Sequence, residues 1–236
     1  MDQINKLRKQ IDKIDLQILN LLKKRSIIAA NIGTEKKSDN LFRPERQARI
    51  LKNILKKNDN NLKSSYILSF WRCIFLSQID IQGGVKIIIS GSIAKSYIKT
   101  IYDYFSHDIE IITINNISKA LEKVYNEKNM LTILPYPNKN QNVKWWTNKK
   151  LEKLYAIAAL PFYLKKKVSP SLLIISKYKP IIEKDSYFIY ISKVLIKNKN
   201  IILETKSNNH YLYRSNIMVK NKDLKLFGVI PQHYEG

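Results

Sequence analysis

The sequence predicts an α plus α/β architecture, in which three helices are followed by an α/β part built on a mixed sheet. From the N-terminus to about residue 37, apolar residues recur every three or four positions, which is the stripe of a long packed helix. Two further helical stretches continue to about residue 82. After Gly83 and Gly84, short β-branched runs alternate with helical stretches. We therefore expect two domains, 1–83 and 84–236.

The first helix should run from about Asp2 to Lys37 and be roughly 50 Å long, at about 1.5 Å per residue. Its stripe consists of Ile4, Leu7, Ile11, Ile14, Ile18, Leu21, Ile28 and Ile32. A helix of this length cannot bury a one-sided stripe by itself. We expect other helices to cover it, including those of a second copy of the chain.

Arg25 occupies a position of this stripe where an apolar residue is due. Burying an unpaired cation costs several kcal/mol, so this guanidinium needs an anion. Taken alone, Arg25 is more typical of a coiled-coil arginine that pairs with a nearby Asp or Glu. The alternative is that a bound ligand supplies the anion.

The second helix should begin at Pro44, whose missing N–H costs nothing in the first turn of a helix, and end at the 58–61 cluster of Asn and Asp. The third should run from about Lys63 to Gln82, with Gln78 and Gln82 one turn apart in its apolar seam. A cation and amides facing a helical core, without His or Cys nearby, indicate a pocket that binds an anion.

In the α/β part we expect a β-α-β-α-β order, which implies parallel strands at the start of the sheet. The elements are strands at 85–89, 110–114 and 131–134 and helices at 94–105 and 117–126. Further strands are expected at 156–162, 172–176, 187–193, 201–204, 210–214 and 227–230. Trp145 and Trp146 are expected to pack in the core or in a contact between domains rather than to stack on a ligand.

The composition excludes several classes of protein. The single cysteine, Cys73, rules out an intramolecular disulfide and is expected to be a packed core thiol, and the three histidines lack metal-ligand spacing. The amphipathic, acid-containing N-terminus is no signal peptide, and no apolar run approaches the roughly 20 residues that cross a membrane. We expect a cytoplasmic protein without a metal or membrane contact.

The formal net charge of +23 would suit a nucleic-acid-binding protein. The lysines, however, are spread along the whole chain among Ile and Asn, and aromatic residues are not interleaved with the basic runs. We therefore do not favour nucleic acid as the partner. A non-enzymatic, basic nucleic-acid-binding or scaffold dimer remains the alternative, which salt-dependent binding without turnover would support.

Several motifs of the helical part form an ordered series. They are Leu7-Arg8-x-x-Ile11-Asp12, Leu21-Leu22-x-x-Arg25, Ile32-Gly33-x-x-Lys36, Arg43-Pro44-Glu45-Arg46-Gln47 and Trp71-Arg72-x-Ile74, ending in Gln82-Gly83. In order and spacing, residues 4–82 resemble the all-helical chorismate mutases. The resemblance implies an intertwined three-helix homodimer that converts chorismate to prephenate in aromatic amino-acid biosynthesis. This intramolecular Claisen rearrangement needs no cofactor, metal or nucleophile.

The resemblance also implies catalytic roles for Arg25, Lys36 and Gln82 and a substrate-binding role for Arg8. Roughly 17 residues, or about 25 Å, separate Arg8 from Arg25 along the first helix, so one small ligand cannot touch both within one chain. If two first helices pair antiparallel, Arg25 and Arg8 of the second subunit would clamp the two carboxylates. Lys36 and Gln82 would donate to the ether oxygen, on which negative charge grows in the transition state.

Three further residues would contact the substrate. Arg46 would support binding, and Gln47 would contact the ring hydroxyl through its amide oxygen. The family commonly has Glu at this position. Gln78 stands where a small hydroxyl residue is frequent, and it would donate to the ring carboxylate or crowd the pocket.

The second half resembles a prephenate dehydratase region followed by a regulatory domain of the ACT type, but the motif residues are altered. Tyr136-Pro137-Asn138 follows the strand where that family has Glu-Asn-Ser, and Pro170-Ser171 replaces a Thr-Arg pair. Glu204-Thr205-Lys206 stands where the regulatory domain has Glu-Ser-Arg. We expect a catalytically silent region, with a bifunctional mutase–dehydratase whose second site has eroded as the alternative.

Overall fold

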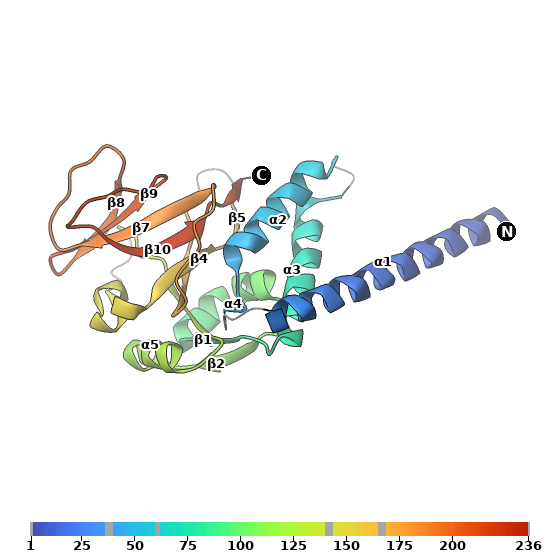
Figure 1. The fold of residues 1–236 in the computed structure, drawn as a ribbon, viewed down its shortest axis with the longest axis horizontal. Coiled ribbons are helices and arrows are strands. Elements are labelled where there is room, and N and C mark those ends of the chain that lie inside the picture. The colour runs from blue at the N-terminus through green and yellow to red at the C-terminus, as the bar shows by residue number, and fades with distance from the viewer. Residues whose placement is uncertain (1, 36–39, 60–61, 140–143, 165–168, 236) are drawn as a thin grey trace.

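The computed structural model describes residues 2–35, 40–59, 62–139, 144–164 and 169–235. In Figure 1 the chain forms a body of sheet and helices from which one long N-terminal helix projects. This is the expected combination of a helical N-terminal region and a mixed-sheet α/β region. No helix among the described residues combines the length and the apolar character needed to cross a membrane.

The N-terminal region contains the three expected helices, α1 (Asp2–Glu35), α2 (Pro44–Lys57) and α3 (Ser64–Ile81). Pro44 lies in the first turn of α2, and Gln82 caps the C-terminal end of α3. Gly83 and Gly84 follow with φ of 112° and 69°, a left-handed conformation that glycine adopts without strain. Proline, with its fixed φ, thus marks the start of α2, and the two glycines allow the turn that follows α3.

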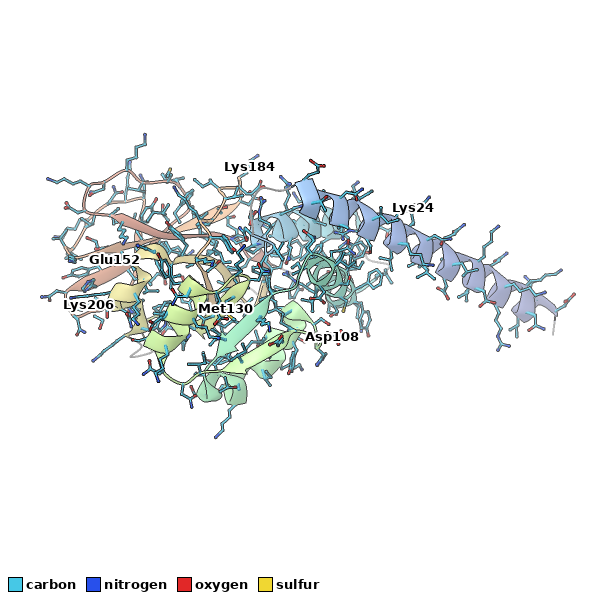
Figure 2. The ribbon with its side chains drawn as sticks, turned by 60° about the horizontal axis from the view of Figure 1, so that its bottom comes forward. Lys24, Asp108, Met130, Glu152, Lys184 and Lys206 are labelled. Atoms are coloured by element: carbon cyan, nitrogen blue, oxygen red, sulfur yellow. The ribbon has the colours of Figure 1, made fainter. Side chains whose placement is uncertain are left out.

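Helix α1 is exposed from Asp2 to Leu21 and partly buried only in its C-terminal part, where its main contact is with α3. None of its residues is buried, and even the stripe residues Ile4 and Leu21 are 60% and 65% exposed. Figure 2 shows side chains extending freely around the helix from near Lys24 to its N-terminus. The apolar stripe predicted from the sequence therefore lies uncovered in the single chain.

The α/β region contains one nine-stranded sheet with the strand order β2-β1-β3-β6-β4-β10-β7-β9-β8. Strands β2, β1 and β3 are parallel, as the alternation of strands and helices predicted, and β10 pairs parallel with β4; the other neighbours are antiparallel. The first elements are β1 (Lys86–Ile89), α4 (Gly91–Phe105), β2 (Glu110–Thr113), α5 (Ile117–Asn126) and β3 (Met130–Pro135). The later strands are β4 (Tyr155–Leu160), β6 (Leu172–Ser176), β7 (Ser186–Ser192), β8 (Ile202–Ser207), β9 (His210–Ser215) and β10 (Lys225–Pro231).

Two short strands and two 3₁₀ turns complete the fold. β5 (Tyr163–Leu164) and β11 (Tyr234–Glu235) pair with each other in a small parallel sheet. The turns Trp145–Thr147 and Lys149–Lys153 precede β4, and both tryptophans are buried, which confirms that they pack in the core. Cys73 is exposed on α3, so the prediction of a core thiol was wrong.

The helical half packs on one face of the sheet. A single cluster of buried residues joins Leu51 of α2 and Phe75 of α3 with Ile101 of α4, Ile87 of β1 and Ile174 of β6. Alternate residues of the same strands face a second cluster, which contains α5 and the two tryptophans. This packing anchors α2 and α3 on the α/β region, whereas α1 is attached to them only near its C-terminal end (Figure 1).

Candidate functional site

A cavity of about 210 Å³ lies where the C-terminal end of α1, the start of α2 and the C-terminal half of α3 meet. The lining residues are Arg25, Ile28, Ala29, Ile32, Leu41, Arg43, Arg46, Gln47, Ile50, Phe75, Gln78 and Gln82. Its polar groups are three guanidinium groups and three amides, and its walls are aliphatic and aromatic. A small, partly apolar anion matches this lining.

Arg25 is a half-buried cation in this lining. No carboxylate among the described residues forms an ion pair with it; instead its guanidinium carbon lies 5.7 Å from the centroid of the Phe75 ring. Burial lowers the pKa of the Arg25 guanidinium, and the like charge of Arg46 lowers this pKa further. An anion placed between the two arginines would relieve both effects.

Arg43 also lines the cavity, but its charge is compensated within the chain. Its Nε donates to Glu45, which is 8% exposed and lies in the first turn of α2. An acid at the N-terminal end of a helix is favoured by the helix dipole as well. Arg25 and Arg46 are therefore the cations of the lining that remain for an anionic ligand.

The two glutamines of α3 have fixed side chains. Gln78 Nε2 donates to Ser26 Oγ on α1 at 2.8 Å, and Ser26 Oγ in turn donates to the carbonyl oxygen of Leu22 at 3.0 Å. Gln78 Oε1 is buried without a hydrogen-bond donor in the described structure. Gln82 Nε2 donates to the carbonyl oxygen of Gln78 at 2.9 Å, which uses one of its two hydrogens.

Gly33 makes room for the Gln82 side chain where α1 crosses α3. A Cβ atom at residue 33 would lie 2.9 Å from Cγ and 3.3 Å from Oε1 of Gln82. Contacts below 3.0 Å do not occur for real Cβ atoms, so a larger residue would displace the Gln82 side chain. Glycine here serves close packing rather than a special backbone conformation.

Gln47 is held by Arg72, which the sequence analysis placed in a motif but to which it assigned no role. Its Oε1 accepts from Nη1 of the buried Arg72 at 2.9 Å. We expected this oxygen to face a ligand hydroxyl, whereas the structure turns it toward Arg72. The signal for Arg72 was available, because it precedes the buried Phe75, Leu76 and Ile79 of α3 at helical spacing, as Arg25 follows Leu21 in α1.

The structure thus brings five of the predicted residues to one cavity, namely Arg25, Arg46, Gln47, Gln78 and Gln82. Arg8 does not line it, because it lies on the projecting part of α1, roughly 17 residues or about 25 Å before Arg25. Lys36 lies outside the described residues. Within the described part of the chain, no group of three His, Cys, Asp or Glu side chains could hold a metal ion.

Comparison with known proteins relates the helical region to one family. Residues 7–83 match the family model "Chorismate mutase type II". A curated relative, the "Bifunctional chorismate mutase/prephenate dehydratase" of Aquifex aeolicus (strain VF5), is 25% identical over 153 residues, which cover 62% of this chain and 42% of the relative. The chain thus spans less than half of that relative's length.

Among solved structures, the prephenate dehydratase from Streptococcus mutans is similar to this chain with a TM-score of 0.41 and 13% sequence identity. The similarity covers 63% of this chain and 98% of the other. A likeness of this strength carries no inference about activity. The match of residues 7–83 bears out the resemblance found from the motifs of α1, α2 and α3.

Proposed function

We propose that this chain is a chorismate mutase that converts chorismate to prephenate in aromatic amino-acid biosynthesis, with residues 1–83 as its catalytic domain. The observation that carries the proposal is the cavity in which Arg25 and Arg46 have no acidic partner among the described residues. It coincides with the region that matches the chorismate mutase type II model. A dicarboxylate such as chorismate supplies the negative charge that the protein does not.

The reaction is an intramolecular rearrangement in which the ether C–O bond breaks as a C–C bond forms. No atom enters or leaves, so the site needs neither a nucleophile nor a proton carrier. Its tasks are to hold the substrate in the reactive conformation and to stabilise the charge that grows on the ether oxygen. Arg25 would bind one carboxylate, and Gln82 would donate its remaining hydrogen to the ether oxygen together with Lys36.

The amides of Gln47 and Gln78 would then divide the remaining polar contacts. Because Gln47 Oε1 accepts from Arg72, its NH₂ group is left to donate to a substrate oxygen. Because Gln78 Nε2 donates to Ser26, its unpaired Oε1 is left to accept from the ring hydroxyl. Arg46, exposed at the rim, would attract the second carboxylate.

The site would be completed by a second copy of the chain. A helix with an uncovered apolar stripe, such as α1, gains stability by packing against another chain. In an antiparallel pair of α1 helices, Arg8 of the second subunit would reach the cavity beside Arg25. The proposed enzyme is therefore a homodimer with two sites, each built from both subunits.

The α/β region, residues 84–236, is proposed to have no dehydratase activity. The ends of β3 and β6 meet where Tyr136 N–H donates to the carbonyl oxygen of Ser171 at 2.8 Å. Pro137 and Pro170 stand beside them, and none of these four residues has a carboxyl or imidazole group. Burial raises the pKa of the Tyr136 hydroxyl, which therefore stays protonated at neutral pH.

The purified chain is expected to consume chorismate and to accumulate prephenate, because the helical site is equipped for the first reaction only. The loss of the ultraviolet absorbance of chorismate measures the first step, and an assay for phenylpyruvate measures the second. Absence of chorismate loss would refute the proposed function. Formation of phenylpyruvate would support the bifunctional alternative. The observation that favours this alternative is the similarity to the bifunctional relative.

Gly33→Ala is expected to lower kcat by roughly 10–100-fold with little change in KM, because it moves the Gln82 donor away from the ether oxygen. Alanine favours the helix more than glycine does, so a loss of α1 structure is not the cause. The control is Gln82→Ala, in which Gly33→Ala should have no further effect. A full effect of Gly33→Ala in that background would contradict the assignment.

A further inference from the structure

Arg72 is a buried cation on α3, outside the lining of the candidate site but in contact with it. Its residue is 4% exposed, and its Nη1 donates to Oε1 of Gln47 at 2.9 Å. Gln47 is itself 8% exposed and lines the cavity. The bond therefore connects the interior of the protein with one polar group of the site.

No acid compensates the charge of Arg72, since none of the ion pairs among the described residues includes it. Its guanidinium carbon lies instead 3.7 Å from the ring centroid of Tyr104 and 5.3 Å from that of Phe162. Aromatic faces attract a guanidinium through their quadrupole, most strongly where water is excluded. Burial lowers the pKa of Arg72, and the interaction with Tyr104 raises it.

Both rings come from the α/β region. Tyr104 lies on α4, and Phe162 follows β4. Tyr104 also packs edge-to-face against Phe42, which lies two residues before the start of α2, with ring centroids 6.3 Å apart. The α/β region thus contributes the aromatic surface against which the side chain of Arg72, a residue of α3, is held.

The contact determines which end of the Gln47 amide faces the cavity. A guanidinium group carries donors and no acceptor, so only the amide oxygen of Gln47 can bond to it. The NH₂ group is then the end that remains for a ligand. Without Arg72, the amide could rotate by 180° and present its oxygen, which would repel a carboxylate.

We propose that Arg72 is a positioning residue for the rearrangement: held by Tyr104 and Phe162, it fixes Gln47 as a hydrogen-bond donor to the substrate. This inference rests on the proposed function and extends it to the α/β region. That region, for which we propose no dehydratase activity, would support the mutase site through packing. The sequence alone separates the two parts, whereas this contact makes one depend on the other.

A double-mutant cycle on the full-length chain tests the coupling, with Arg72→Met, Gln47→Leu and the double variant. Arg72→Met is expected to lower kcat/KM about tenfold, mostly through KM, since a donor to a carboxylate binds ground state and transition state alike. In the Gln47→Leu background, Arg72→Met should leave KM unchanged. Equal effects in both backgrounds would overturn the proposal, because a merely structural arginine acts independently of Gln47.

Variants of the aromatic side test the role of the α/β region. Tyr104→Leu removes the ring and is expected to raise KM as Arg72→Met does, whereas Tyr104→Phe keeps the ring and should preserve KM. The matched control is Arg49→Met, which removes an exposed α2 arginine that contacts Glu183 of the α/β region at 3.1 Å, away from the cavity. An unchanged KM in Tyr104→Leu would overturn the role of the α/β region in holding Arg72. This test does not depend on Arg72→Met, so it remains decisive if that variant folds poorly.

A spectroscopic measurement keeps this test separate from the proposed function. The side-chain NH₂ signals of Gln47 in ¹⁵N-labelled protein, identified by their absence in Gln47→Leu, report the amide without any turnover. They are expected to move toward the values of free glutamine in Arg72→Met but not in Arg49→Met. Unchanged signals in Arg72→Met would overturn the positioning role. If these signals move but the wild-type chain does not consume chorismate, only the proposed function fails.

Discussion

Replacing Arg25 with alanine is expected to lower kcat/KM for chorismate by at least roughly 10²–10³-fold, while the chain stays folded. The large effect follows from the place of Arg25 in the lining of the cavity, where it would bind a carboxylate in bidentate fashion without a competing acid among the described residues. Turnover is measured by the loss of chorismate absorbance, and folding by the helical circular-dichroism signal and the midpoint of thermal unfolding.

The stability of the fold should be preserved, because removing Arg25 leaves no described carboxylate without its ion-pair partner. Removing one member of a buried ion pair is strongly destabilising, but no described carboxylate pairs with Arg25. The substitution also removes the repulsion from Arg46 that contributes to the lowered pKa of Arg25. Ordinary turnover in Arg25→Ala would exclude the assigned cavity as the active site.

Two controls separate the charge of Arg25 from its geometry. Arg25→Lys keeps the charge but loses the planar fork, so its kcat/KM should lie between the wild type and Arg25→Ala. Arg49→Ala removes an exposed arginine of α2 and should leave kcat/KM unchanged. If Arg49→Ala were as damaging as Arg25→Ala, the loss would reflect the positive surface in general rather than one site.

Co-expression of Arg8→Ala and Arg25→Ala chains is expected to restore about a quarter of the wild-type turnover, although each variant alone is inactive. In the proposed dimer, each site uses Arg25 of one subunit and Arg8 of the other. A mixed dimer then has one site with both arginines and one with neither. With random pairing, about half of the dimers are mixed, and half of their sites are intact.

Differently tagged chains allow the mixed dimers to be purified from this mixture, and the purified mixed dimers should have about half of the wild-type turnover, since one of their two sites is intact. Co-expression of Arg25→Ala with Arg46→Ala is the matched control, because both residues line the same cavity within one chain. No mixed dimer of that pair has an intact site, and no activity should return. If the Arg8 and Arg25 pair gave no recovery either, Arg8 would not act across the subunit interface.

Most of the secondary structure was predictable because it depends on local patterns. Helix α2 begins at Pro44 and ends before Asn58, helix α3 ends shortly before Gly83 and Gly84, and every strand expected from a β-branched or alternating run is present. Strand order was not predictable beyond the first parallel strands. β10, near the C-terminus, lies between β4 and β7, a pairing that depends on contacts between residues far apart in sequence.

The site was partly predictable for the same reason. Arg25 interrupts an apolar stripe, and Gln78 and Gln82 lie one turn apart, so periodicity alone places these side chains on faces that pack together. The orientation of the amides was not predictable. Which end of Gln47 faces the cavity depends on Arg72, which lies 25 positions away in sequence.

The sequence by itself therefore determined the helical character of the N-terminal region, its resemblance to the chorismate mutases and the types of polar residue that line the cavity. These follow from spacing along one chain, which is a local property. Only the tertiary structure decided that Arg25 meets no described acid, that Arg72 rests on rings of the α/β region and that Cys73 is exposed. Burial and pairing depend on which distant surfaces meet, and no local pattern encodes that.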